Sequence, residues 1–245
     1  MLSICATPIG NLGDVTLRVL DTLRRADAIL AEDTRVTRKL LAANDIHTSL
    51  ERCDANVLAQ RLPQLLARLE AGEHLAYVSD AGMPGISDPG LLLVAAARQA
   101  GLAVEVLPGA SAVLTALVAA GLAGTGSAFY FGGFLPRKEA QIRTLLNSLA
   151  ELDAALVFYE SPHRAARTLA LIAEVFAERE VALARELTKL HEEVLRLPAP
   201  ELAAQIAARE AAGQPLKGEV ALVISPPVAD KSPRQHVDKY ASGEA

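Results

Sequence analysis

Short apolar runs alternate with longer stretches of helical periodicity along nearly the whole chain. This rhythm is typical of repeated β-α-β units, and it predicts an α/β fold with mainly parallel sheets. The predicted strands are Leu2–Ala6, Ala28–Glu32, Leu75–Ser79, Val104–Leu107, Ala128–Phe131, Ala154–Tyr159, Glu180–Arg185 and Glu219–Ile224. Helices are expected to fill the intervals between them.

Capping residues mark the ends of several of these helices. Asp14 is placed to cap a helix that ends near Arg25, and Ser111 is placed to cap one that ends before Gly121. Pro200 sits where a third helix should begin, because proline is well tolerated in a first helical turn.

Small and glycine residues in the segment "GLAGTGSA" interrupt two otherwise regular α/β halves. We therefore expect an N-terminal domain over 1–120, a linker over 121–127 and a C-terminal domain over 128–226. The remaining residues, 227–245, are polar and aperiodic, which predicts a loose tail.

The composition narrows the possible environments and partners. Hydrophobic residues make up 51% of the chain and aromatic residues only 4%, which suits buried strands covered by alanine-rich helices. The formal charge of −5 argues against wholesale wrapping of nucleic acid but leaves room for a local basic patch. Cys5 and Cys53 lack metal-ligand spacing, so no metal site is expected. Neither a leader nor a membrane-spanning run is evident, so we expect a cytoplasmic protein.

Ligands of parallel α/β sheets bind beyond the carboxyl ends of the strands, so the chemistry is expected in the loops there. The first loop, "TPIGNLGD", has neither of the glycine spacings that cradle phosphates. The loops also lack a nucleophile elbow, an HExxH pair and a Walker lysine. Glycine, small residues and carboxylates dominate them, which indicates a ligand with hydroxyl or amino groups and little negative charge.

Each loop also has a purely structural interpretation. "SDAGMPGISDPG" could be a long turn whose aspartates bond backbone amides, and Thr34 of "EDTRVTRK" could simply cap a helix. "PGASA" could be a cap with small residues for packing. His163 and His191 have no partner at a suggestive spacing, and Lys217–Gly218 could be a plain turn.

Basic residues also gather at the predicted strand ends, so a second, anionic ligand is plausible beside the first. They are Arg35, Arg38, Lys39, Arg137, Lys138, Arg164, Arg185, Lys189 and Lys217.

Five motifs, "ATPIGNLGDVTL", "AEDTRVTRKLL", "VSDAGMPGISDPG", "FYESPHR" and "ARELTKLHEE", occur in one order over about residues 1–226. Together they resemble the small-subunit ribosomal RNA (cytidine-2'-O)-methyltransferases, within the tetrapyrrole methylase class. The resemblance implies two α/β domains with S-adenosylmethionine (SAM) in the cleft between them, usually in a homodimer. It also implies methylation of the ribose 2'-hydroxyl of a cytidine in the decoding region of small-subunit (16S) rRNA.

Carried over by motif, the resemblance implies a cofactor shell on both domains. Its members would be Pro8, Asp80, Ala81, Gly82, Met83, Ile86, Ser111, Ala112, Tyr159, Leu187, Lys217 and Gly218. Met83 and Ala110 stand where the family usually has threonine and proline, and the helical extension of longer members is replaced by a short polar tail.

A ribose hydroxyl is a very weak acid, so a base or cation must help to remove its proton. Glu160, Glu186, Lys189 and His163 are the candidates on neighbouring loops, and Lys189 with Glu186 is favoured. The expected RNA contacts are Arg35, Arg38, Arg137, Lys138, Arg164 and Arg185.

Two other functions stay open at this point. The same class of fold methylates tetrapyrroles and other small acceptors, and the net acidic charge does not oppose such a substrate. A non-catalytic SAM-binding protein associated with the ribosome is the other alternative.

Overall fold

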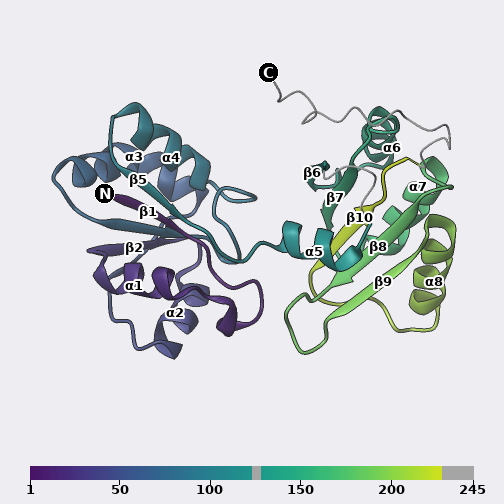
Figure 1. The fold of residues 1–245 in the computed structure, drawn as a ribbon, viewed down its shortest axis with the longest axis horizontal. Helices are drawn as coiled ribbons and strands as arrows, with labels where there is room; N and C mark the ends of the chain where they lie inside the picture. Colours follow the sequence, from purple (N-terminus) through teal and green to yellow (C-terminus); the bar gives the residue numbers. More distant parts are fainter. Residues whose placement is uncertain (123–127, 228–245) are drawn as a thin grey trace, which may run out of the picture.

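A computed structural model describes residues 1–122 and 128–227, which form two α/β domains lying side by side (Figure 1). The expected two-domain α/β fold class is therefore confirmed. The first domain contains β1 (Leu2–Cys5), a 3-10 turn (Leu12–Asp14), α1 (Leu17–Arg25), β2 (Ala28–Ala31), α2 (Thr34–Ala43), β3 (Leu50–Arg52), α3 (Ala55–Glu70), β4 (Leu75–Val78), α4 (Gly90–Gln99) and β5 (Val104–Leu107).

The first sheet is wholly parallel, with strand order β3-β2-β4-β1-β5. Its central strands are buried on both faces because helices cover each side. Leu2 and Ile4 of β1 pack with α3 and α4, whereas Cys5 packs with α1 and α2. Such two-sided burial explains why these strands are continuous apolar runs in the sequence.

This strand order places a topological switch point between β1 and β4. The adjacent strands β1 and β4 are followed by α1 and α4, which lie on opposite faces of the sheet. The connections therefore diverge and leave a crevice beyond the carboxyl ends of these two strands, where open α/β sheets bind ligands.

The second domain has a mixed sheet of order β6-β7-β10-β8-β9. Its elements are α5 (Ala112–Ala120), β6 (Phe129–Phe134), α6 (Glu139–Ser148), β7 (Ala155–Glu160), α7 (Ala165–Val175), β8 (Glu180–Arg185), β9 (Glu193–Pro198), α8 (Ala199–Ala211) and β10 (Val220–Ile224). Helices α6, α7 and α8 contribute to the core on one face, and α5 packs on the other.

The second sheet differs from the expected mainly parallel arrangement. Five of the eight pairings among the described strands are parallel, but in the second sheet only β6 with β7 is parallel. Because β10 runs opposite to β7 and β8, its amino end meets their carboxyl ends. The loops after β7 and β8 and the turn before β10 therefore share one edge of the sheet.

Helix α5 lies with the second domain rather than the first. Val113, Ala116 and Ala120 pack in the same core cluster as Val157 and Val223 of the second sheet. The chain consequently passes between the domains at 108–111, before α5, and not at the expected linker 121–127. Most of that expected linker, 123–127, and nearly all of the expected tail lie outside the described residues.

Several local predictions also change. Thr16 caps α1 with its side chain instead of Asp14, and Asp33 caps α2 instead of Thr34. Ser111 is the residue before α5 as predicted, but its side chain makes no capping hydrogen bond. Two edge strands, β3 and β9, were not predicted. No helix of the described parts of the chain is long and apolar enough to cross a membrane.

Helix α4 offers a matched pair of leucines to test how the first domain is held together. Leu93 is fully buried, whereas its neighbour Leu92 is 47% exposed. Leu93→Ala should destabilise the domain by about 2–5 kcal/mol through a core cavity. Leu92→Ala should change the free energy of unfolding by less than about 1 kcal/mol. Urea denaturation monitored by circular dichroism measures both, and equal losses would contradict the packing described.

Candidate active site between the two domains

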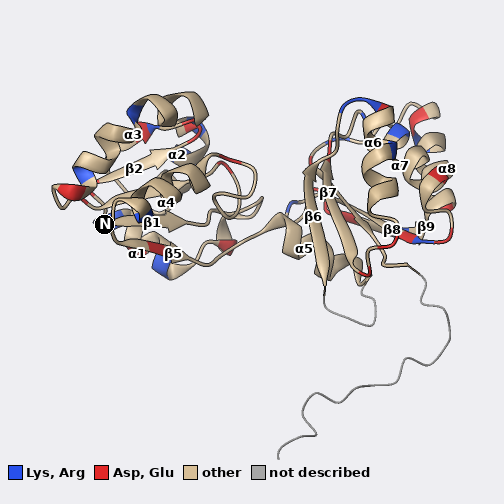
Figure 2. Cartoon of the chain, turned by 90° about the horizontal axis from the view of Figure 1, so that it is seen from above, with Lys and Arg blue, Asp and Glu red and all other residues tan. Residues whose placement is uncertain are grey.

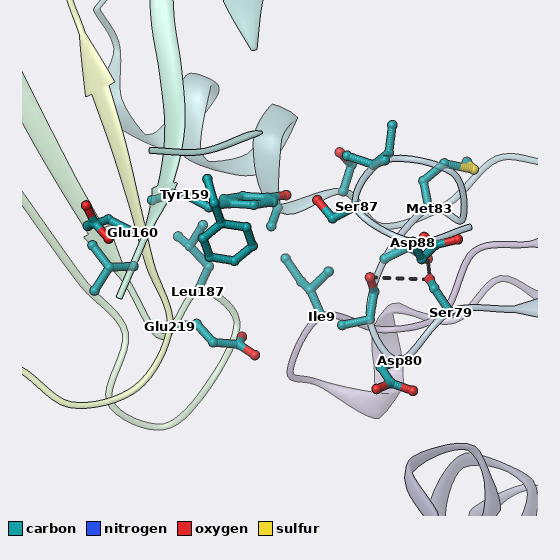
Figure 3. Close-up of a pocket in the computed structure, with 18 of the residues that line it drawn as sticks. Ile9, Ser79, Asp80, Met83, Ser87, Asp88, Tyr159, Glu160, Leu187 and Glu219 are labelled. Carbon is teal, nitrogen blue, oxygen red and sulfur yellow. Dashed lines mark hydrogen bonds between the residues drawn. The ribbon is translucent and has the colours of Figure 1, made fainter. Parts of the chain in front are cut away.

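A cavity of about 540 Å³ lies between the domains, at the switch point of the first sheet (Figure 3). Ile9, Ser79 and Met83 come from the first domain, and Tyr159 and Leu187 come from the second. A cavity of this size, formed from two domains, is typical of a site for a small ligand.

Backbone hydrogen bonds hold the first-domain wall. Thr7 and Gly82 form a bridge in which each N–H donates to the other's carbonyl oxygen at 3.0 Å. Ser79 Oγ donates to the Gly82 carbonyl at 3.2 Å. Gly82 has φ +81°, and a Cβ there would come within 3.2 Å of Ile9 Cγ2, so the turn favours glycine at this position.

The two aspartates of this loop have structural partners. Asp80 Oδ1 accepts the Asp33 N–H at 2.8 Å, which ties the loop after β4 to the loop after β2. Asp88 accepts the N–H groups of Gly85 and Gly90 at 2.9 and 2.8 Å. Both carboxylates line the cavity, so the structural interpretation of this turn and the ligand-binding one are compatible.

Aromatic side chains form part of the second-domain wall. The Tyr159 ring contacts Phe131 and Phe134, with ring centroids 5.0 and 5.4 Å apart. Burial, followed by the charge of Glu219, raises the pKa of Tyr159 to about 12, so its phenol stays protonated at neutral pH. This wall can stack against a planar group and can donate one hydrogen bond.

The charged side chains that line the cavity are all acidic. They are Glu32, Asp80, Asp88, Glu160 and Glu219. No lysine, arginine or histidine among the described residues belongs to the lining. An anionic phosphate ligand would meet only like charges here, whereas a neutral or cationic ligand would not. The structure thus agrees with the expectation of a ligand with little negative charge.

Most of the predicted cofactor residues meet at this cavity. Those in its lining are Asp80, Ala81, Gly82, Met83, Ile86, Ser111, Ala112, Tyr159, Leu187 and Gly218. Pro8 and Lys217 are not in the lining, and the Lys217 side chain is exposed. The role of these residues in binding a cofactor stays a prediction.

Apart from Leu187, which lines the cavity, the "RELTK" loop forms its rim. Glu186 and Thr188 adopt φ of +52° and +66°, a left-handed conformation that costs non-glycine residues energy. A Cβ at Gly10 of the first domain would lie 2.5 Å from Lys189 Cγ and 2.7 Å from Thr188 Oγ1. The strained loop is therefore pressed against the first glycine turn across the domain boundary.

Lys189 is held between two carboxylates on this rim. Its Nζ donates to Glu186 Oε1 at 2.8 Å and to Glu219 Oε2 at 2.9 Å. Burial lowers the pKa of the Lys189 ammonium, but the two hydrogen bonds outweigh burial and leave the pKa raised. Hydrogen bonding to Lys189 lowers the pKa of Glu186. Lys189 is therefore a cation at neutral pH.

Glu160 is a buried residue whose carboxylate is hydrogen-bonded within the second domain. It is 2% exposed, and its carboxylate accepts hydrogen bonds from Ser161 N, Thr168 Oγ1 and Arg164 at 2.6, 2.6 and 3.1 Å. Arg164 also donates to the carbonyls of Leu135 and Pro136, so it fixes the segment that follows β6.

The predicted RNA contacts divide into paired and unpaired cations. Arg35 pairs with Asp33 at 2.6 Å, and Arg185 pairs with Glu193 at 3.0 Å. Arg38, Arg137 and Lys138 are exposed and make no ion pair within the described parts of the chain. Figure 2 shows positive charge on the segment that enters α6, where Arg137 and Lys138 lie.

Ile9, Glu32, Phe134 and Glu219 are among the cavity residues that sequence reasoning missed. Glu32 directly follows a buried strand, and Glu219 lies in "LKGE" beside a predicted strand, so position alone could have indicated both.

His163, a candidate from the sequence, and the two cysteines lie outside this site. His163 lines a separate cavity of about 230 Å³ beside α7 and α8. Burial raises the pKa of Cys5 to about 12, which keeps that thiol protonated. Within residues 1–122 and 128–227, no group of three or more His, Cys, Asp and Glu side chains could hold a metal ion.

Solved structures with this fold include methyltransferases. The chain superimposes on the methyltransferase CobJ with a TM-score of 0.66 and 22% identity, covering 95% of this chain and 96% of that one. It also matches a uroporphyrin-III C-methyltransferase from Thermus thermophilus complexed with S-adenosylhomocysteine, with a TM-score of 0.60 and 16% identity, covering 91% and 96% of the two chains. At these identities the likeness shows the fold alone.

Sequence relatives are considerably closer. A protein of Halalkalibacterium halodurans named ribosomal RNA small subunit methyltransferase I is 45% identical, over 98% of this chain and 84% of that protein. A Thermotoga maritima protein of the same name is 44% identical, over 91% and 97% of the two. The family model of the tetrapyrrole (corrin/porphyrin) methylases matches residues 1–203. The chain therefore belongs to the tetrapyrrole methylases and, within them, to the family of ribosomal RNA small subunit methyltransferase I.

Proposed function

We propose that this protein transfers the methyl group of SAM to the ribose 2'-hydroxyl of a cytidine in the decoding region of small-subunit rRNA. The observation that carries the proposal is the interdomain cavity, which is lined by carboxylates and small residues and by no described basic side chain. The names of the relatives support rRNA of the small subunit as the substrate. The proposed place of action is the cytoplasm, where ribosomal subunits are found.

The residues of the cavity fit SAM. Its sulfonium and ammonium groups are cationic, and carboxylates contributed by both domains complement them. Ser111, Ala112 and Gly82 leave room for close backbone approach, and the Tyr159 ring offers a surface for the planar adenine. The absence of cationic lining residues in the described chain disfavours ATP and NAD.

When bound, SAM supplies a methyl group that is already activated by the positive sulfur. The protein then has to hold the acceptor oxygen in line with that methyl group and exclude water, which is worth several orders of magnitude in rate. The two domain walls can do both, because the first glycine turn and the "RELTK" loop close against each other at Gly10.

Lys189 acts in this proposal as a cation and not as a base. Because its ammonium remains charged, it can bind a phosphate of the substrate or stabilise the developing negative charge on the ribose oxygen. Glu186 and Glu219 hold the ammonium in place. Glu160, which is saturated by internal hydrogen bonds, has no proton-transfer role here.

RNA docking is proposed for the unpaired cations Arg38, Arg137 and Lys138, which lie on both domains. Arg164 donates to the Leu135 carbonyl and Arg185 to the Lys217 carbonyl, so we assign both arginines to positioning the loops beside the cavity. Arg35 can contribute only at the cost of its pair with Asp33.

A homodimer is also proposed. Leu114 and Val118, four residues apart on α5, are 51% and 80% exposed and share one helix face. Exposed apolar side chains that are adjacent on one element are typical of interfaces. Light scattering after size exclusion would give the mass, and a monomer at micromolar concentration would contradict the dimer.

We expect calorimetry to detect binding of SAM and S-adenosylhomocysteine and no binding of ATP or NAD. Asp80→Ala should weaken SAM binding by about 1–3 kcal/mol, because the loops after β2 and β4 lose the hydrogen bond between them. Asp80→Asn keeps an acceptor oxygen and should bind better than the alanine variant. Tight ATP binding, or unchanged affinity in Asp80→Ala, would contradict this assignment.

The activity is tested by transfer of labelled methyl groups from SAM to assembled small subunits, naked rRNA and a precorrin. Label should appear in the rRNA as 2'-O-methylcytidine after nuclease digestion. The rate should fall as salt rises, because phosphate contacts release counterions. In the double variant Arg137→Ala with Lys138→Ala, the slope of log rate against log salt concentration should become shallower by about two, because about two phosphate contacts are lost. SAM binding should be unchanged. Label in the precorrin alone would favour a small acceptor, and label in none would favour a non-catalytic binder.

Lys189→Met keeps the length of the side chain and removes the charge. We expect methyl transfer to slow by about 100-fold or more, with the affinity for S-adenosylhomocysteine unchanged, if the cation acts mainly in the transition state. Lys189→Arg should retain part of the rate. If Lys189→Met transfers methyl groups normally, the rim lysine has no part in the reaction.

A further inference from the structure

The proposed reaction releases a proton from the ribose hydroxyl, and none of the groups predicted to accept it is available. Lys189 is already protonated, and Glu186 accepts hydrogen bonds from Lys189 Nζ and Glu219 N at 2.8 and 2.9 Å. Glu160 accepts from three donors. His163 lies at a different cavity. The proton acceptor must therefore be sought among the remaining carboxylates of the lining.

Three of those carboxylates also have protein partners. Asp80 accepts the Asp33 N–H, Asp88 accepts the N–H groups of Gly85 and Gly90, and Glu219 pairs with Lys189. Asp88 is the most heavily engaged, because both of its oxygens accept the Gly85 N–H at 2.9 Å. Protonating Asp88 would therefore disrupt the loop that shapes the cavity.

Glu32 is different from the other four. It lines the cavity, but its carboxylate accepts no hydrogen bond and forms no ion pair with any of residues 1–122 and 128–227. It follows β2 directly, and β2 pairs in parallel with β4, with Ala31 beside Val78. This register places Glu32 beside Ser79 and Asp80, at the first-domain end of the cavity.

We propose that Glu32 is the general base of this enzyme and accepts the proton of the acceptor hydroxyl. The inference rests on the proposed function. As the O–H bond breaks, its proton passes to a carboxylate oxygen of Glu32, and the oxygen electron pair forms the new bond to the methyl carbon. The carbon–sulfur bond breaks with its electron pair left on sulfur, which becomes a neutral thioether. Glu32 returns the proton to water before the next turnover.

The electrostatic surroundings of Glu32 favour this role. Burial raises the pKa of the Glu32 carboxyl, and the charges of Asp80, Asp88, Asp54 and Asp33 raise it further. Asp80 and Asp88 face it from the loop after β4, Asp54 follows β3, and Asp33 is its own neighbour. A carboxylate with a raised pKa is a better proton acceptor than one with an ordinary pKa.

The structure also makes the test interpretable. The Glu32 carboxylate makes no hydrogen bond with any described residue, so Glu32→Gln is expected to fold normally while removing the base. Glu174→Gln is the matched control, because Glu174 is 54% exposed and pairs with Arg143 on the outer surface of the second domain. Circular dichroism and S-adenosylhomocysteine binding check both variants before any rate is measured.

We expect Glu32→Gln to lower kcat for methyl transfer to small subunits by at least about 100-fold, with KM and S-adenosylhomocysteine affinity within about twofold. Glu32→Asp should recover part of the rate. Because the base must be ionised, the wild-type rate should fall as pH drops through the pKa of Glu32, above the ordinary value of about 4.3. That acidic limb should be absent from the residual rate of Glu32→Gln.

A second readout does not depend on turnover. In a 13C NMR titration of glutamate carboxyls in the protein without SAM, one resonance with a raised midpoint should be missing from Glu32→Gln and present in Glu174→Gln. Normal kcat in Glu32→Gln would overturn the proposal. So would a loss of S-adenosylhomocysteine affinity that matches the loss of rate, since Glu32 would then be a cofactor contact. Failure of the proposed function would appear instead in the wild type, as no transfer to rRNA.

Discussion

The contact between the first glycine turn and the "RELTK" loop determines how the two domains enclose a ligand. Gly10 lies against Leu187, Thr188 and Lys189 so closely that the position has no room for a Cβ. Ile9, its neighbour, is buried in the core cluster that includes Val157 and Val223 of the second sheet. A loop of the first domain thus completes the core of the second, and the cavity exists because these surfaces meet.

That contact is maintained by strain that other interactions offset. Glu186 and Thr188 hold left-handed backbone conformations, each of which costs roughly 1–3 kcal/mol. Glu186 Oε1 accepts the Glu219 N–H and the Lys189 ammonium, and these charge-assisted bonds fix the loop. Glycine at 218, with φ +87°, leaves the space that the Glu186 carboxyl occupies. Rim and cavity are therefore built from one set of interactions.

Charge divides the site into two parts with different tasks. The lining is acidic, which suits a cationic cofactor, and burial followed by the charges of Asp80 and Asp88 raises the pKa of Glu32. The cations lie outside the lining, at Lys189 on the rim and at Arg38, Arg137 and Lys138 on the exposed surface. In the proposed function, this separation would let RNA approach without drawing phosphate into the cavity, although the chain has a formal charge of −5.

The sequence by itself determined the class of fold and the loops that carry the site. Strands buried on both faces, such as β1, β2 and β4, leave continuous apolar runs that can be read directly, and the motif loops follow them. Short or half-exposed edge strands, β3 and β9, leave no such pattern and were missed. The direction of β10 was also invisible, because an apolar run has the same composition in either direction.

Only the tertiary structure decided which ionisable groups are free to react. Glu160 was a catalytic candidate and Arg164 and Arg185 were expected RNA contacts, yet partners on the next element of the fold engage them, as with Thr168 on Glu160 and Glu193 on Arg185. Hydrogen bonds to Glu186 and to Glu219, which is thirty residues away in the chain, raise the pKa of Lys189 and keep it charged. Glu32 belongs to the motif "AEDTRVTRKLL", but that its side chain has no partner among the described residues is evident only in the folded chain. Hydrogen-bond satisfaction depends on neighbours in space, and a single sequence does not contain them.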